Sequence, residues 1–312
     1  MRTIVVGYGV QGVKRKKIAD ASVVAVVDPV SGEATHKTLE AVPLDSYDAA
    51  FVCTPDDAKS SLLHYLIGHG KHILVEKPLI FDSPQDIEKL EGLCAKNKVT
   101  CYTAYNHRFE PHFVKMKEVL ESGCLGKIYS VSLFYGNGTA RLVRGSPWRD
   151  QGQGVLADLG SHLLDTILFW FDRKDYEFSI VKAHCFENKA FDHLVFASQN
   201  SDPFIQCELS LLSWRNHFRA DFYGEGGSAH ISSLCKWGPS TFTLRKRVFP
   251  SGRPSEESIT LVQEDPTWKS EYEHFKKICE KGSTNLSNDA WIQTNLEFLF
   301  SQTQQGVKKN VA

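Results

Sequence analysis

The chain has 312 residues, of which 42% are apolar and 23% are charged, and its formal net charge is −1. This length allows two domains with a sizeable core. The near-neutral charge, and the lack of an apolar run as long as a membrane span, give no reason to expect nucleic acid or a membrane as a partner.

The N-terminus enters a strand-like run at once, at residues 3–6, and shows no cleavable signal pattern. The eight cysteines are widely scattered, and none of them forms a Cys-x-x-Cys pair. Both features favour a cytoplasmic protein with free thiols, and the cysteine spacing argues against a structural zinc site or a disulfide framework.

A Gly-x-Gly-x-x-Gly pattern follows the first strand, with the sequence Gly7-Tyr8-Gly9-Val10-Gln11-Gly12. A helix-forming stretch (13–20) and a second apolar strand (23–27) come next, and that strand ends at Asp28. Because glycines cluster in many turns, the pattern alone is also compatible with a plain turn. Its position between a strand and a helix, with an acid about twenty residues further on, is typical of a dinucleotide-binding fold.

The three glycines have distinct roles in such a fold. Gly7 allows the tight turn, Gly9 lets the backbone approach a pyrophosphate, and Gly12 lets the helix and the strand pack closely. The backbone amides at Val10 and Gln11, at the start of the helix, are expected to bind phosphate.

Asp28 favours NAD over NADP as the cofactor. A carboxylate at this position hydrogen-bonds a ribose hydroxyl and repels the 2′-phosphate of NADP. The next residues, 29–31, include no arginine that would bind such a phosphate. A run of basic residues at 14–17 keeps NADP as the alternative, although a charge run on a helix is usually a solvated face.

The first domain continues with strands expected at 49–53, 73–75 and 100–104 and helices at 57–68 and 85–97. Little room remains between the second and third strands, so a truncated or missing crossover helix is expected there.

Polar residues follow the last three of these strands: Thr54-Pro55, Glu76-Lys77-Pro78, and Asn106 with Arg108. The carboxyl ends of parallel strands share one edge of a sheet, where ligands bind, so these are candidate site residues. The structural alternative for Lys77 is a surface ion pair with Glu76. We place the domain boundary between residues 105 and 106.

The second domain is expected to begin with a helix at 111–122 and a strand at 127–135. The segment 136–154 is rich in glycine and arginine and is predicted to be a loop. Its arginines, Arg141, Arg144 and Arg149 (next to Trp148), suggest an anionic group on the substrate. The alternative is a solvated or subunit-contacting loop.

A helical stretch from 154 to 165 places Asp158 and His162 four residues apart, on one side of the helix. Asp165 lies three residues beyond the histidine. Flanking carboxylates orient a histidine and raise its pKa, which suits proton abstraction from a hydroxyl. A structural pair is one alternative. A metal site is another, but it lacks an evident third ligand, and the lysine would repel a cation, so no metal is predicted.

Six short strands are expected between residues 179 and 246, followed by helices at 267–281 and 288–305. The strands predict one large, mostly antiparallel open sheet. Burial of its free face would make the protein a homodimer or homotetramer. The final helix, near 288–306, can pack back on the first domain.

Taken in order, these motifs resemble the glucose–fructose oxidoreductase / inositol dehydrogenase / rhizopine catabolism (Gfo/Idh/MocA) family of NAD(P)-dependent oxidoreductases. The motifs are the glycine pattern, Thr54-Pro55, Glu76-Lys77-Pro78, Asn106-x-Arg108-Phe109, Trp148-Arg149, Asp158-x-Gly160-x-His162-x-x-Asp165 and Gly224-x-x-Gly227. The resemblance implies an α/β protein with a Rossmann domain (1–105), a doubly wound parallel sheet, and a substrate-binding and oligomerisation domain (106–312) on the large sheet.

The resemblance also implies hydride transfer between a nicotinamide and a secondary alcohol or ketone of a sugar, cyclitol or sugar nucleotide. Lys77, Asp158 and His162 would be catalytic, with His162 as the acid/base. The implied cofactor-binding residues are Gly7, Gly9, Val10, Gln11, Gly12, Asp28, Thr54, Pro55, Glu76, Lys77 and Asn106. The implied substrate-binding residues are Lys77, Arg108, Trp148, Arg149, Asp158 and His162.

Two departures from the family pattern concern the cofactor site. The family often has Asn and His where this chain has Asp56 and Lys59, and the first half-domain is short. Alternatives of the same fold are an aldose 1-dehydrogenase, a dihydrodiol-type dehydrogenase and a non-catalytic NAD-binding regulatory protein.

Overall fold

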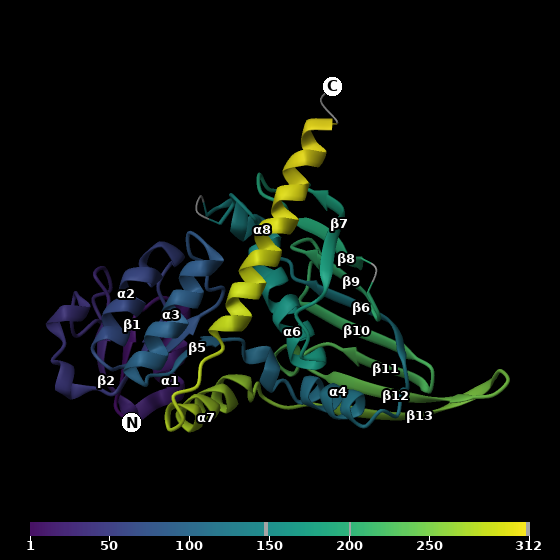
Figure 1. The fold of residues 1–312 in the computed structure, drawn as a ribbon, viewed down its shortest axis with the longest axis horizontal. Coiled ribbons are helices and arrows are strands. Elements are labelled where there is room, and N and C mark those ends of the chain that lie inside the picture. The colour runs from purple at the N-terminus through teal and green to yellow at the C-terminus, as the bar shows by residue number, and fades with distance from the viewer. Residues whose placement is uncertain (147–148, 200, 310–312) are drawn as a thin grey trace. The chain divides into compact units, whose positions relative to one another are not determined.

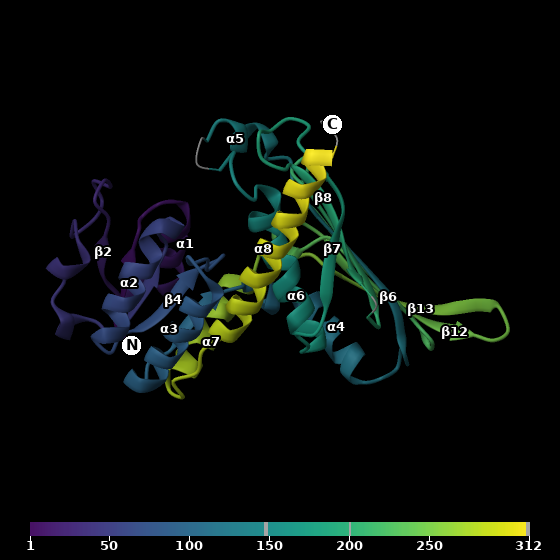
Figure 2. The same cartoon turned by 45° about the horizontal axis from the view of Figure 1, so that its top comes forward.

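The computed structural model describes residues 1–146, 149–199 and 201–309, with side chains described up to residue 304. The chain forms two compact units (Figures 1 and 2). The first unit is Met1–Asn106 with Thr267–Gln293, and the second is His107–Pro266 with the residues from Thr294 onward. The structural division therefore falls one residue after the expected boundary, but residues 267–293 belong to the first unit.

A five-stranded parallel sheet forms the centre of the first unit, in the order β2-β1-β3-β4-β5. Its strands are β1 Thr3–Val6, β2 Val23–Val27, β3 Ala49–Val52, β4 His72–Glu76 and β5 Cys101–Ala104. The apolar side chains of these strands are buried on both faces, as expected for a parallel sheet covered by helices. The strand order reverses between β1 and β3, and ligands of such sheets bind at the carboxyl ends of the strands there.

Helices cover both faces of this sheet. They are α1 Val10–Ala19, α2 Asp56–Gly68, α3 Pro84–Asn97, α7 Thr267–Cys279 and the start of α8, Leu286–Lys309. The helices α2 and α3 share one core cluster with the sheet, whereas α1 and α7 share the other. Between β2 and β3 the chain makes two 3₁₀ turns, Leu39–Ala41 and Leu44–Ser46. The expectation of a missing crossover helix there is confirmed.

The helix α7 corrects the expectation that residues 267–281 belong to the second domain. Phe51 of β3 makes edge contacts with Tyr272, with ring centroids 5.6 Å apart, and with Phe275, at 6.2 Å. These aromatic rings cover a sheet face that α1 alone would leave open. The first residues of α8 also belong to this unit, where Gln293 exchanges two hydrogen bonds with the backbone of Phe81.

A buried ion network joins three elements of the first unit. The Arg15 side chain is 2% exposed, and it donates to Glu76 and Glu271, each at 2.7 Å. Its guanidinium also lies over the ring of Trp268, 4.3 Å from the centroid. Because an unpaired buried charge is costly, α1, the end of β4 and α7 must pack together as observed.

An eight-stranded sheet forms the second unit, in the order β13-β12-β11-β10-β6-β9-β8-β7. Only the β6–β9 pair is parallel among these neighbours, so the expected mostly antiparallel sheet is confirmed. Its strands are β6 Ile128–Gly136, β7 Glu177–His184, β8 His193–Gln199, β9 Phe204–Ser210, β10 His217–Gly224, β11 Gly227–Ser232, β12 Ser240–Val248 and β13 Gly252–Leu261.

The helices α4 Pro111–Glu121 and α6 Ser161–Phe171 pack on one face of this sheet (Figures 1 and 2). Aromatic contacts join them to β10, with centroid distances of 4.8 Å for Phe113–Phe218 and 5.2 Å for Trp170–Phe222. The second half of α8 follows, and Gln302 accepts a hydrogen bond from the backbone of Ile180 in β7.

A strand and a short α-helix of the second unit were not predicted. The strand β13 forms a hairpin with β12 that extends beyond the neighbouring strands (Figure 1). Its residues are exposed except for half-buried Leu261, so its sequence lacks the alternation that marks a half-buried strand. The predicted loop 136–154 also contains a short helix, α5 Ala140–Arg144, in which Ala140 and Val143 are buried.

Replacing Arg15 by Met would leave two buried carboxylates without their cation. We expect the free energy of unfolding of the first unit to fall by about 3–5 kcal/mol, as measured by urea denaturation. The control is Lys17→Met, which replaces an exposed lysine of the same helix and should leave the urea concentration at the unfolding midpoint unchanged. Equal midpoints for the two variants would contradict the importance of the network.

Candidate functional site

The glycine motif forms the turn between β1 and α1. Gly7 has φ +89°, and a Cβ there would lie 2.7 Å from the carbonyl oxygen of Cys53. A Cβ on Gly12 would overlap the carbonyl oxygen of Gly7, whereas one on Gly9 would meet open space. The helix α1 begins at Val10, and no side chain caps its amides. The turn therefore leaves room and backbone donors for a phosphate group.

Asp28 lies beside this turn. One of its carboxylate oxygens accepts from the amide of Tyr8 at 2.7 Å, and the other accepts from Val30 at 2.8 Å and Ser31 at 2.7 Å. The hydrogen bond from Ser31, together with those from Tyr8 and Val30, lowers the pKa of Asp28, so the carboxylate stays charged at neutral pH. Its oriented oxygens can still accept from a ribose hydroxyl.

Thr54 follows β3 and adjoins the glycine turn. A Cβ on Gly7 would lie 3.1 Å from the Thr54 methyl carbon. The Thr54 hydroxyl is buried and makes no hydrogen bond within the described part of the chain. Buried hydroxyls normally have a partner, so a bound ligand would complete this site. The next residue, Pro55, is exposed and immediately precedes α2.

Lys59 holds the turn that follows β4. Its side chain is 2% exposed, and its ammonium donates to a carboxylate oxygen of Asp56 at 2.7 Å. It also donates to the carbonyl oxygens of Glu76 and Pro78, both at 2.6 Å. The buried amine thus fixes the backbone on both sides of Lys77, which is half-buried and precedes a cis peptide bond.

Two other predicted cofactor residues have internal partners. The Glu76 carboxylate binds Arg15, as described above. The Asn106 amide donates to the hydroxyl of Thr267 at 2.8 Å. Both side chains therefore support the ligand edge of the sheet, and direct contact with a cofactor stays a prediction.

In the second unit, Arg108 binds both carboxylate oxygens of Asp165, with the shortest contact at 2.6 Å. Asp165 is 1% exposed, and burial raises the pKa of its carboxyl group, an effect that Arg108 opposes. Helical spacing predicted that this carboxylate adjoins His162, but its oxygens bind the arginine instead. A role for Arg108 in substrate binding stays a prediction.

His162 is 7% exposed on α6, and its ring is stacked on His107, with centroids 4.1 Å apart. Nε2 of His107 lies 3.1 Å from the ammonium of Lys236. An ammonium can only donate, so this nitrogen accepts and the His107 ring is neutral in this arrangement. Tyr135 of β6 meets the His162 ring edge-on at 5.9 Å.

Asp158 lies in a π-helical turn, Leu156–Gly160, that leads directly into α6. Such turns are rare and are frequently found at functional sites. Its carboxylate is 3.5 Å from the guanidinium of Arg149. The structure thus places Arg149, Asp158 and His162 along one segment, whereas Trp148 lies outside the described residues.

The contacts of His162 with His107 and Tyr135, and of His107 with Lys236, were not predicted from the sequence. His107 lies within the Asn106-x-Arg108 motif, which was a usable signal. Tyr135 and Lys236 come from distant segments, and no local pattern marks them. Within the described residues, no group of three or more His, Cys, Asp and Glu side chains is arranged to bind a metal ion. Nor does that part of the chain contain a helix with the length and apolarity needed to cross a bilayer.

Comparison with known protein families agrees with this geometry in both units. Residues 2–105 match the family model described as "Oxidoreductase family, NAD-binding Rossmann fold". Residues 113–230 match the model described as "GFO/IDH/MocA C-terminal domain". The chain belongs to the GFO/IDH/MocA family. The resemblance and the fold class expected from the sequence are confirmed.

Several members of this family and solved structures are similar to the chain. Inositol 2-dehydrogenase of Rhizobium meliloti (strain 1021) is 27% identical over 163 residues, which are 48% of this chain and 48% of that protein. The match therefore spans about half the length of the relative.

Levoglucosan dehydrogenase in complex with NADH has a TM-score of 0.83 at 15% identity, over 98% of this chain and 97% of that one. UDP-N-acetylglucosamine 3-dehydrogenase from Acidithiobacillus ferrooxidans has a TM-score of 0.79 at 16% identity, over 97% of each chain. At these identities the two structures show a shared fold.

The first unit is accordingly an NAD-binding Rossmann domain, and its residues fit a dinucleotide. Gly9 leaves open space where a pyrophosphate would approach, and the buried Thr54 hydroxyl has no hydrogen-bond partner within the described residues. Asp28 presents a charged acceptor of the kind that a ribose needs.

Replacing Lys59 by Met would leave the carbonyls of Glu76 and Pro78 without their donor. We expect the free energy of unfolding of the first unit to fall by about 2–4 kcal/mol in urea, because buried acceptors left unpaired are costly. A matched control is Lys89→Met, which removes an exposed lysine with the same three-residue spacing from its aspartate. If both variants unfold at the same urea concentration, Lys59 does not hold the turn.

Proposed function

We propose that this GFO/IDH/MocA protein is a dehydrogenase that transfers a hydride between NAD and a secondary alcohol or ketone. The observation that carries the proposal is the environment of His162. This buried imidazole, stacked on a neutral histidine and preceded by Asp158 in a π-helical turn, belongs to a chain with an intact dinucleotide turn. Similar proteins are named inositol, levoglucosan and UDP-N-acetylglucosamine dehydrogenases, which supports a sugar, cyclitol or sugar nucleotide as substrate.

In the proposed reaction, residues of the first unit bind the cofactor and His162 of the second unit transfers the proton. NAD, when bound, supplies the hydride acceptor. The glycine turn and the α1 amides bind its pyrophosphate, and Asp28 orients a ribose. His162 takes the proton of the substrate hydroxyl, and the Lys77 ammonium stabilises the negative charge that develops on that oxygen. The Arg149–Asp158 pair helps to orient the acid/base group.

We also propose that the open face of the eight-stranded sheet is the contact surface between subunits of a homodimer or homotetramer. Alternation along β9 and β10 turns their buried residues toward the helices and Phe204 and Tyr223 toward the opposite face. These two aromatic side chains are exposed. Exposed aromatic groups are typical of interfaces.

Lys77→Ala and His162→Ala should each lose at least ~10²-fold in kcat, because each removes a group that acts on the reacting oxygen. Steady-state kinetics on a panel of inositols, sugars and sugar nucleotides would measure the loss, and calorimetry should show that both variants still bind NAD. The exposed His64 of α2 provides the control His64→Ala. The fold-loss in kcat of the double variant, Lys77→Ala/His162→Ala, should be smaller than the product of the two single fold-losses. Turnover like that of the wild type in either single variant would contradict the assigned role.

Asp28→Asn removes the charge at the ribose site but keeps an acceptor for the backbone amides. We expect the ratio of kcat/KM for NAD to that for NADP to fall about tenfold or more, because repulsion of the 2′-phosphate is lost, a difference of roughly 1.4 kcal/mol. The ratio is read from parallel assays with the two cofactors. An unchanged ratio would mean that Asp28 does not determine the preference for NAD over NADP.

A further inference from the structure

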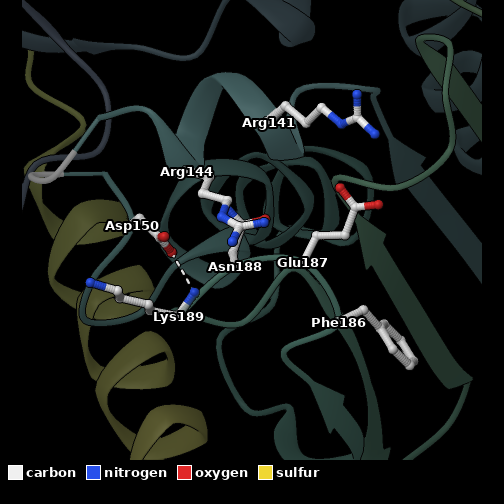
Figure 3. Close-up of a pocket in the computed structure, with 7 residues that line it drawn as sticks. All are labelled: Arg141, Arg144, Asp150, Phe186, Glu187, Asn188 and Lys189. Atoms are coloured by element: carbon white, nitrogen blue, oxygen red, sulfur yellow. Dashed lines mark hydrogen bonds between the residues drawn. The ribbon is translucent and has the colours of Figure 1, made fainter.

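A pocket of about 650 Å³ lies in the second unit, apart from the residues assigned to catalysis above (Figure 3). It is lined by residues of α5, by the segment after it and by the loop between β7 and β8. The lining residues are Arg141, Arg144, Asp150, Phe186, Glu187, Asn188 and Lys189. The volume is that of a typical small-molecule site.

The charge of this pocket is positive. Arg141, Arg144 and Lys189 are exposed, and none of them forms an ion pair with another described residue. Two carboxylates oppose these three cations, so the formal sum is +1. One of them, Asp150, accepts a hydrogen bond from the amide of Lys189 at 2.8 Å (Figure 3). It also accepts one from the amide of Ala190 at 3.0 Å, and these two dipoles offset part of its charge. The pocket therefore favours an anion.

The walls of the pocket are held in place without a ligand. Buried Asp192 accepts from the amides of Phe186, Glu187 and Asn188, at 2.6–3.0 Å. The side-chain amide of Asn188 donates to the carbonyl of Ala140 in α5 at 2.9 Å, which joins the loop to the helix. The Asn188 carbonyl oxygen is buried and has no donor among the described residues. It can accept a hydrogen bond from a hydroxyl of a bound molecule.

The pocket also adjoins the segment that leads to Asp158. The amide of Val155 donates to the carbonyl of Phe191 at 2.8 Å, just after the pocket loop. A Cβ on Gly154 would lie 2.5 Å from the same carbonyl oxygen, so the two segments are in close contact. Asp150 lines the pocket, and its neighbour Arg149 pairs with Asp158. A ligand that bridges α5 and the loop would therefore stabilise the segment carrying Asp158.

We propose that this pocket binds the phosphate group of a phosphorylated polyol. A guanidinium suits a dianionic phosphate better than a singly charged carboxylate, because it can donate two hydrogen bonds to the phosphate, and the Lys189 ammonium adds to the positive charge of the pocket. Asn188 would bind a hydroxyl of the same molecule. The phosphate belongs either to the substrate, which rests on the proposed function, or to a separate effector, which does not.

The test is calorimetric titration of the full-length protein with inorganic phosphate, glucose 6-phosphate and glucose. Glucose 6-phosphate should bind measurably tighter than glucose, and Arg141→Gln/Arg144→Gln should weaken its binding at least tenfold. The matched control Arg247→Gln/Arg253→Gln removes two arginine charges from the β12–β13 hairpin instead. Its affinity for glucose 6-phosphate should be within twofold of that of the wild type. Circular dichroism would confirm that each variant is folded.

Equal binding of glucose 6-phosphate by the Arg141→Gln/Arg144→Gln variant and the wild type would overturn the proposal, as would no binding of either phosphate compound at millimolar concentration. Turnover assays show whether the bound phosphate belongs to the substrate or to a separate effector. A lower KM for a phosphorylated polyol than for its parent identifies a substrate phosphate, and a change in kcat/KM of the parent on adding inorganic phosphate identifies an effector. These binding results do not depend on turnover, so failure of the dehydrogenase assignment would leave them interpretable.

Discussion

One buried guanidinium determines how the ligand edge of the first unit is built. Arg15 pairs with Glu76, 61 residues away, and with Glu271, 256 residues away. Burial of this cation is tolerable only if both carboxylates reach it, so α1, β4 and α7 are required to meet at one place. The same helix follows the glycine turn, and Lys77 follows the same strand. Lys59 adds a second buried cation, which fixes the backbone on both sides of Lys77. Two buried charges thus position the groups that the proposed chemistry needs.

The second unit positions its groups differently. His162 is held by stacking against His107, and Lys236 keeps that ring neutral by donating to it. The π-helical turn carries Asp158 toward the start of α6 and leaves its carboxylate within reach of Arg149. Packing thus holds the ring that we propose as the acid/base, and one ion pair holds Asp158 in the turn before it.

Local sequence patterns predicted most of the elements and part of the site. The glycine turn, Asp28 and the strand ends at Thr54 and Glu76 were predictable because each depends on a few neighbouring residues and on the strand before them. The membership of α7 in the first unit was not, because its contacts with Phe51 join segments more than 200 residues apart. The burial of Lys59 was signalled only by its position on the apolar side of α2, with Leu63 and Leu66. The partner of Asp165 could not be read from helical spacing, because Arg108 reaches it from another segment.

The β12–β13 hairpin places a long strand at the outer edge of the large sheet, with a row of backbone groups that no other strand of the described residues covers. Such an edge can recruit a strand from another chain and begin aggregation. Here the exposed strand carries Arg253, Pro254 and a Glu256-Glu257 pair, and its charges cross-link to β12 through Arg245 and Lys246. A proline interrupts donation along the edge, and an approaching strand would have to desolvate several charges. The hairpin can therefore protrude into solvent while remaining resistant to fibril-like association.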